Sequence, residues 1–253
     1  MLLSLILLTG SIGCRVLTSG LAGDGAFADN PDAAAAAEVC DIVERADGSM
    51  TIDVGEPPGV YGAPDIVGCS DGTREGFRGS VYWKDIWPNI AGCAGAFDRP
   101  GVVGPPDIHP TCNLLAGDTN VNRSGKGCTA ADLCAAGWHV CRNGGDVANH
   151  SPTRDCEGCV PAGEPRFFLV ASGASAMGIC SPDSQEVNDL HGCGGLGQPE
   201  TQDCAPLSRR MGFADCLATD GVWLCGGQAD SLQEAKIVTK ADTTLGGVLC
   251  CRD

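Results

Sequence analysis

Apolar residues along this chain stand in short runs that glycine and proline separate, a pattern typical of short strands joined by turns. Strands are predicted at residues 49–54, 79–83, 138–141, 167–170 and 247–252. A short helix is predicted at residues 129–136, with Thr129 as N-cap, Asp132 in the capping-box position and Gly137 as the stop. The fold class is therefore α+β, with short antiparallel strands and one or two short helices.

The composition indicates that disulfide bonds stabilise this fold more than a large hydrophobic core does. Aromatic residues make up only 5% of the chain, against 37 glycines and 15 prolines, so few large side chains are available for burial. Seventeen cysteines are present, which is high for a chain of this length. A small disulfide-rich domain is the expected result.

The first cysteine, Cys14, is expected to have a different role from the other sixteen. It follows the apolar leader MLLSLILLTGSIG, and the run Ser11-Ile12-Gly13-Cys14 resembles the lipobox of bacterial lipoproteins, whose cysteine is lipidated and becomes the new N-terminus. No basic residue precedes the apolar run, and Ser11 stands where the family usually carries Leu. An ordinary signal peptide cleaved nearby is the alternative, and both routes export the chain.

The remaining sixteen cysteines are predicted to form disulfides in an oxidising compartment. Cys250 and Cys251 are adjacent on a predicted strand, so their side chains point to opposite faces and require two different partners. The predicted disulfide cysteines are Cys40, Cys69, Cys93, Cys112, Cys128, Cys134, Cys141, Cys156, Cys159, Cys180, Cys193, Cys204, Cys216, Cys225, Cys250 and Cys251.

The predicted organisation has three parts. Residues 1–13 are a signal peptide, residues 14–38 a lipidated N-terminus and flexible acidic tether, and residues 39–253 a disulfide-rich extracytoplasmic body. Residues 100–110, with sequence PGVVGPPDIHP, are the expected internal joint of that body.

The charge of the chain excludes one class of partner. The formal net charge is −16, and nine acids between Asp24 and Glu56 face a single base, Arg45. Such a chain repels phosphate backbones, so no nucleic acid is expected as a partner. No stretch beyond the leader approaches the ~20 apolar residues of a membrane span, so a lipid on Cys14 is the expected link to the membrane.

A calcium site is the one metal site that the sequence suggests. Asp118, Asn120 and Asn122 place oxygen side chains at alternate positions, as calcium loops do. Arg123 occupies the position where an EF-hand needs glycine, and a structural turn uses the same residue types. No other cofactor is expected.

Other motifs favour structural roles. The pair Cys156 and Cys159 lacks a second pair at zinc-finger spacing, so bridges to each other or to distant partners are expected. The glycine-rich run at residues 192–197 has no βαβ context and is interpreted as a disulfide-pinned turn. The aromatic residues Tyr82, Trp83 and Trp87 are expected in the core, with a sugar- or protein-binding surface as the alternative. His139 is expected to be buried and hydrogen-bonded.

Five blocks of this sequence resemble a group of cysteine-rich bacterial surface lipoproteins: DGTREGF (71–77), IAGC (90–93), ADLCAAGWHVC (131–141), NDLHGCGGLG (188–197) and GGVLCCR (246–252). The resemblance covers residues 68 to 252 and implies a shared fold and an exported location. It implies no activity and no functional residues.

A looser resemblance is to C-type-lectin-like domains, in which a cysteine on a helix is followed by a glycine turn and a strand and bonds to a cysteine in the final strand. Cys134, Gly137, the strand at 139–141 and Cys250 or Cys251 stand in that order. The family's WIGL-type core strand and its sugar-binding EPN or QPD tripeptide are missing. The resemblance implies a fold and does not by itself imply sugar binding.

The sequence thus predicts an exported protein, lipid-anchored at the outer membrane or cell surface or otherwise secreted, with a binding or structural role and no enzymatic activity. A surface glycan or a protein is the expected partner besides the membrane. One alternative is a lectin-like carbohydrate or calcium-dependent adhesion module. Another is a secreted hydrolase that uses paired carboxylates such as Asp183, Glu186 and Asp189.

Overall fold

The computed structural model describes residues 41–44, 50–53, 67–78, 83–103, 108–161, 163–174, 180–181, 188–200, 204–226 and 233–253. The chain divides into two compact units, Met1–Val60 and Tyr61–Asp253. Cys14, Cys40, the predicted signal peptide and the predicted tether lie outside the described residues. The expected joint at residues 100–110 falls within the second unit, where Gly101 and Val102 donate backbone hydrogen bonds to Val238 and Ala235.

The first unit contains one described pair of strands. β1 (Asp41–Glu44) and β2 (Met50–Asp53) pair antiparallel, with Ile42 opposite Ile52. β2 lies within the strand predicted at residues 49–54, so that prediction is confirmed.

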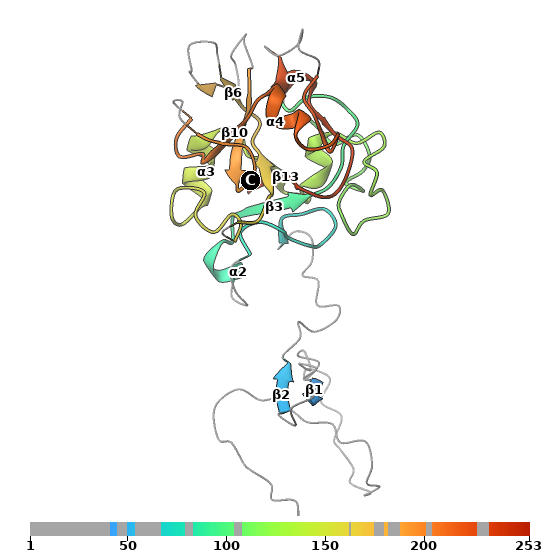
Figure 1. Cartoon of the computed structure of the whole chain (residues 1–253), viewed down its shortest axis with the longest axis vertical. Coiled ribbons are helices and arrows are strands. Elements are labelled where there is room, and N and C mark those ends of the chain that lie inside the picture. Colours follow the sequence, from blue (N-terminus) through green and yellow to red (C-terminus); the bar gives the residue numbers. More distant parts are fainter. Residues whose placement is uncertain are drawn as a thin grey trace, which may run out of the picture. The chain divides into compact units, whose positions relative to one another are not determined.

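The second unit is a mixed α+β fold whose elements are all short, as the sequence predicts (Figure 1). Its helices are α2 (Trp83–Ile86), the 3₁₀ helix η1 (Ala130–Leu133), α3 (Gly144–His150), α4 (Phe213–Leu217) and α5 (Glu234–Ile237). Its strands are β3 (Ile90–Ala94), β4 (Trp138–Val140), β5 (Phe167–Leu169), β6 (Gly173–Ala174), β7 (Cys180–Ser181), β8 (Leu190–Gly194), β9 (Gln198–Pro199), β10 (Arg209–Met211), β11 (Trp223–Leu224), β12 (Thr239–Lys240) and β13 (Gly246–Arg252).

Seven strands form the main sheet in the order β3-β13-β5-β8-β10-β9, with β4 pairing to the C-terminal part of β13. β13 is central: it runs antiparallel to β3 along one edge, and on its other edge parallel to β5 and antiparallel to β4. Figure 1 shows β13 and β3 in the middle of the body, with α4 and α5 together above them and α2 below. β6 pairs with β7, and β11 with β12, in separate two-stranded sheets.

Apolar layers cover both faces of the main sheet. On β13, Val248 and Cys250 belong to one buried cluster, and Leu249 and Cys251 belong to the other. β5 alternates in the same way, with Phe168 on the opposite face from its two neighbours. Strands buried on both faces are apolar at every position, which explains the continuous runs FFLV and GVLCC.

The two adjacent cysteines of β13 bond to partners on opposite faces, which confirms the prediction from the sequence. Cys250 bonds to Cys134, at the end of η1, and Cys251 bonds to Cys141, which directly follows β4. The two bridges close loops of 116 and 110 residues. The middle of the domain is thereby tied to its last strand from both sides.

Fourteen of the predicted cysteines are bonded in seven disulfides. The other five bridges are Cys69–Cys93, Cys112–Cys128, Cys156–Cys193, Cys180–Cys204 and Cys216–Cys225.

Cys159 is wrong in the predicted set, because its thiol is buried and unpaired. Its side chain belongs to the apolar cluster that contains Phe77, Trp87 and Phe168, whereas the side chain of Cys156 bonds to Cys193 on β8. Burial raises the pKa of the Cys159 thiol far above its ordinary value, so this sulfur is an inert apolar group.

The block DGTREGF connects the start of the second unit to the main sheet through hydrogen bonds of Arg74 and a β-bridge of Gly76. Arg74 is buried, and its guanidinium donates to the carbonyl oxygens of Val67 at 2.7 Å and Trp87 at 2.8 Å. Gly76 forms an isolated antiparallel bridge with Gly92 on β3. A Cβ atom on Gly92 would lie 2.6 Å from the Cα of Gly76, so this close approach requires glycine.

Most predicted elements of the second unit are present. The predicted helix is a 3₁₀ helix shorter than expected, with the capping box of Thr129 and Asp132 and with Gly137 at a positive φ of 78°. The strand predicted at residues 79–83 is wrong at Trp83, which begins α2, while residues 79–82 lie outside the described residues. Of the helices that the structure describes, none is long and apolar enough to cross a bilayer.

We expect the stabilities of two disulfide variants to separate the central bridge from a peripheral one. The bridge Cys134–Cys250 spans 116 residues and Cys216–Cys225 spans 9, and all four residues are buried. Constraint of the unfolded chain is worth about 5 kcal/mol for the long loop and about 2.5 kcal/mol for the short one. Changing Cys134 and Cys250 together to Ala should therefore lower the free energy of unfolding by about 2 kcal/mol more than the same change at Cys216 and Cys225. Urea denaturation measures both, and equal losses would contradict the central role of β13.

Candidate functional site

The predicted calcium residues lie in the loop that the disulfide Cys112–Cys128 closes, and the two asparagines are hydrogen-bonded to that loop. Asn120 donates to the carbonyl oxygens of Leu114 and Ala116, each at 3.3 Å, and accepts from the N–H of Val121. Asn122 accepts from Ser124 and from the N–H of Lys126. Both asparagines hold the backbone of their own loop.

Asp118 faces a different set of groups. Its carboxyl group accepts a hydrogen bond from the Thr73 hydroxyl at 3.3 Å and is hydrogen-bonded to Asp71. Asp71 in turn accepts from the N–H of Thr73 at 3.0 Å and of Thr119 at 3.2 Å. The block DGTREGF therefore supplies the partners of Asp118, which the sequence spacing within the loop did not indicate.

Glu75 completes an acidic cluster with Asp71 and Asp118. Its Oε2 accepts from the N–H of Ala94 on β3 at 2.8 Å. Burial raises the pKa of Glu75 to about 8, and the charges of Asp118 and Asp71 add to the shift. Burial also raises the pKa of Asp118, followed by the charge of Asp71 and the hydrogen bond to it. Neighbouring carboxylates repel each other, and a bound cation would offset that repulsion.

A second polar cluster joins α3 to the C-terminal residue. His139 on β4 contacts Asp253 through Nδ1 at 2.6 Å and Asp146 through Nε2 at 3.0 Å. The hydrogen bond to Asp146 is the main cause that raises the pKa of His139, and His150 contacts the other carboxylate oxygen of Asp146 at 3.2 Å. A carboxylate contacts each ring nitrogen of His139, so the predicted hydrogen bonding is confirmed. The prediction that His139 is buried is wrong, because its side chain is 20% exposed.

The structure also contains an apolar surface pocket that the sequence did not indicate. It has a volume of about 230 Å³ and lies between α4 and β11, with Phe213 and Trp223 in its lining. Leu217 and Leu224 also line it and are 64% and 46% exposed. The disulfide Cys216–Cys225 fixes the two sides of the pocket, so its shape is built into the fold. All of its lining residues lie in the continuous segment from Phe213 to Gly226, so α4, the following turn and β11 form the pocket locally.

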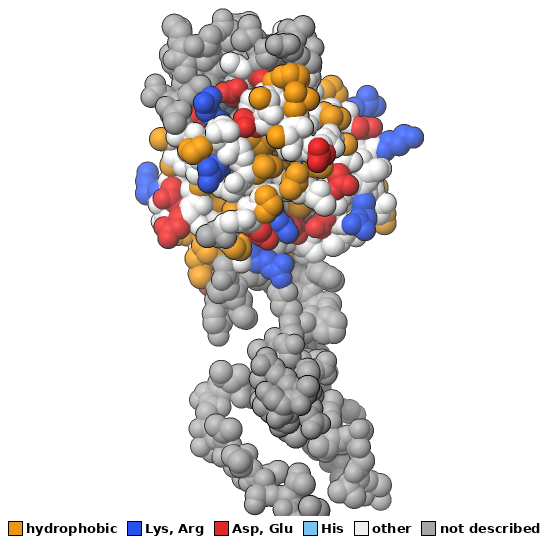
Figure 2. All heavy atoms as spheres, in the orientation of Figure 1, with side chains coloured by type: hydrophobic (Ala, Val, Ile, Leu, Met, Phe, Trp, Pro, Cys, Tyr) orange, Lys and Arg blue, Asp and Glu red, His pale blue; other side chains and the backbone are white. Residues whose placement is uncertain are grey.

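On the face shown in Figure 2, positive and negative side chains are interspersed and form no patch of one charge. They surround a strip of hydrophobic atoms. This arrangement differs from the basic stripe that nucleic-acid-binding proteins carry.

The other residues that the sequence analysis singled out are packed or hydrogen-bonded within the fold. Trp87 is buried and packs edge-on against Phe77, and the side chains of Tyr82 and Trp83 lie outside the described residues. The run at residues 192–197, predicted as a turn, is strand up to Gly194 and bends only at residues 195–197. Its disulfide, Cys156–Cys193, is attached to β8 itself. Asp189 forms an ion pair with Arg210 at 2.9 Å.

The proposed hydrolase carboxylates cannot be assembled from the described residues, because Asp183 and Glu186 lie outside them. Another carboxylate, Glu234, is buried and accepts from the N–H groups of Asp189 and Phe213, so it joins α5 to α4.

Comparison with known proteins leaves these clusters as the basis for any functional argument. No protein-family model matches the chain, and no solved structure matches its fold.

We expect the pH dependence of stability to report on Glu75. The folded-state pKa of about 8 lies above the ordinary value of 4.5, so between these values the folded protein holds a proton that the unfolded chain has released. Stability should therefore fall as pH rises from 4.5 to 8, by up to about 1.4 kcal/mol per pH unit. Glu75→Gln keeps an acceptor for the N–H of Ala94 and should flatten this slope, measured by thermal melting at each pH. A variant slope equal to that of the wild type would contradict the assignment.

Proposed function

We propose that this protein is exported, is anchored to a membrane through a lipid on Cys14, and displays a disulfide-locked domain with a binding or structural role at the outer membrane or cell surface. The observation that carries the proposal is the set of seven disulfides in the described part of the chain. Such sets form and persist outside the reducing cytosol.

The binding role is supported by the apolar pocket between α4 and β11. Leu217 and Leu224 expose apolar surface in the lining of this pocket, and two other lining residues, Cys216 and Cys225, are bonded to each other. Preformed apolar pockets with few polar groups are typical of binding sites for proteins and small ligands. A protein or a surface glycan is the proposed partner. No catalytic activity is proposed.

The lipid anchor can be tested by mass spectrometry of the protein isolated from its native membrane. We expect a mature chain that begins at Cys14 and carries a diacylglycerol group on its sulfur. The variant Cys14→Ser should lose the lipid and appear in the soluble fraction with its disulfides intact. A mature N-terminus beyond Cys14, without lipid, would establish an ordinary signal peptide instead.

A lectin-like, calcium-dependent adhesion module is the second candidate function. It is favoured by the bond between Cys134, at the end of η1, and Cys250 in the last strand, which follows the order of the C-type-lectin-like resemblance. The proposed calcium site in this case is Asp118 with its neighbour Asp71, because Asn120 and Asn122 are occupied by their own loop.

Calcium titration followed by thermal melting tests this candidate. Millimolar Ca²⁺ should raise the melting temperature of the wild type by several degrees, and a chelator should reverse the rise and abolish binding to a glycan array. Asp118→Asn should remove the rise, whereas Asp98→Asn, on a neighbouring loop, should not. No shift in the wild type, or the same shift in both variants, would leave the loop with a structural role only.

A further inference from the structure

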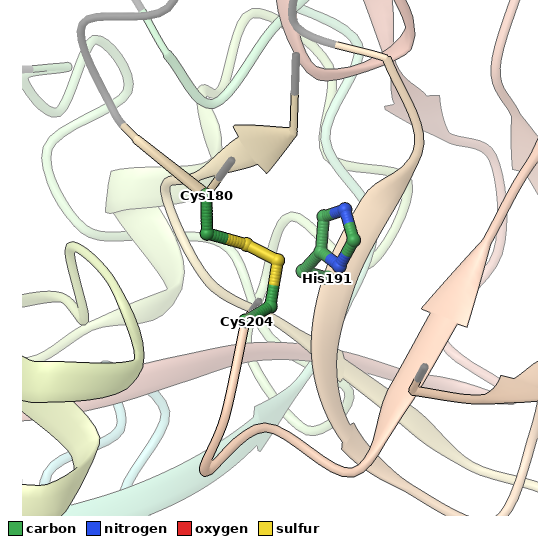
Figure 3. A group of neighbouring side chains, drawn as sticks. All are labelled: Cys180, His191 and Cys204. Carbon is green, nitrogen blue, oxygen red and sulfur yellow. A yellow bond between two sulfur atoms is a disulfide. The ribbon is translucent and has the colours of Figure 1, made fainter. Parts of the chain in front are cut away.

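One buried group outside the clusters described above combines two sulfur atoms with an unpartnered imidazole nitrogen. Cys180 on β7, His191 on β8 and Cys204 offer Sγ, a ring nitrogen and Sγ that all lie within 4.8 Å of one another. Figure 3 shows the imidazole of His191 beside the disulfide between the two cysteines. The three residues lie within one stretch of the chain, since Cys180 and Cys204 are 24 positions apart.

The contact of Nδ1 of His191 determines whether Nε2 can act as a metal ligand. Nδ1 lies 2.5 Å from Oε2 of Glu200, and both side chains are buried. In the neutral tautomer whose Nδ1–H donates a hydrogen bond to this carboxylate, Nε2 carries a lone pair. Histidines that ligate metal ions are oriented by the same kind of carboxylate contact.

Nε2 of His191 has no hydrogen-bond partner, although the residue is fully buried. A buried polar atom without a partner is rare and calls for a functional explanation. The two sulfur atoms of Cys180 and Cys204 lie close to the imidazole. While they are bonded to each other, they have no proton to donate to Nε2. As thiolates, they and Nε2 would form a set of two sulfurs and one nitrogen, which zinc prefers.

We propose that Cys180, His191 and Cys204 form a redox-gated zinc site. In the oxidised protein the two sulfurs are bonded; a dithiol reductant transfers two electrons and two protons to this bond and becomes a disulfide itself. Zn²⁺ then displaces the two thiol protons and binds both thiolates and Nε2 of His191, with a fourth position for water. Cys180 is partly exposed and gives the reductant access, while Glu200 holds the imidazole in the ligating tautomer.

Differential alkylation of the full chain tests the proposal. The oxidised protein is treated with a limiting amount of a water-soluble phosphine, which replaces the dithiol because dithiols themselves bind zinc, and is then alkylated over time with or without Zn²⁺. Peptide mass spectrometry gives the alkylation rate of each cysteine. Zn²⁺ should slow the alkylation of Cys180 and Cys204 at least tenfold and that of Cys216 and Cys225, a bridge without a histidine in the zinc-ligand group, less than twofold.

Two variants distinguish a zinc site from general protection of sulfur. His191→Gln should abolish the protection, and Glu200→Gln, which keeps all three ligands, should weaken zinc binding about 10- to 100-fold. His139→Gln is the matched control and should behave as the wild type. If His191→Gln does not fold, as judged by circular dichroism, Glu200→Gln decides the matter.

Three results would overturn the proposal. The first is equal protection of the wild type and the variant at His191, or of all cysteine pairs. The second is no protection by Zn²⁺ in the wild type. The third is a Cys180–Cys204 bond that opens only when the whole domain unfolds, since that bridge would then be structural.

Discussion

The fold depends on the two bonds that hold the last strand from opposite faces. β13 has neighbours along both edges, and its adjacent cysteines reach Cys134 on one side and Cys141 on the other. Because successive residues of a strand point to opposite faces, adjacent cysteines secure two apolar layers at once. Two layers built from few aromatic residues are thereby joined at one strand, where burial alone would give limited stability.

Buried charges provide the second constraint, because much of the backbone lies outside regular elements. Arg74 holds two carbonyl oxygens. Lys240 donates to the carbonyl oxygens of Asp242 and of Thr244, the latter at 2.6 Å, and lies over the ring of Trp223. Burial lowers the pKa of Lys240 to about 7, so this contact is made at the cost of desolvation. Each long cation satisfies loop carbonyls that no helix or strand satisfies, which lets the loops be buried.

The sequence predicted the parts of the fold that local patterns determine. Apolar runs identified β4, β5 and β13, and the adjacency of Cys250 and Cys251 required two partners on two faces. It did not predict the partner of Asp118 or the absence of a bond at Cys159, because both depend on which distant segments meet. The acidic cluster joins Asp71 and Asp118, which lie in different segments of the chain. Spacing along the chain contains no information on such contacts.

The seven bridges are not equivalent, and their positions explain how one of them can have a role other than stability. Cys134–Cys250 spans 116 residues and ends in the central strand, so it constrains a large part of the unfolded chain. Cys180–Cys204 spans 24 residues and begins in β7, which among the described strands pairs with β6, outside the main sheet. His191, by contrast, lies on β8 inside the main sheet and keeps its position through backbone pairing to β5 and β10. A rigid imidazole beside a bridge of small structural consequence is an arrangement in which the sulfurs can change their chemistry while the fold remains intact.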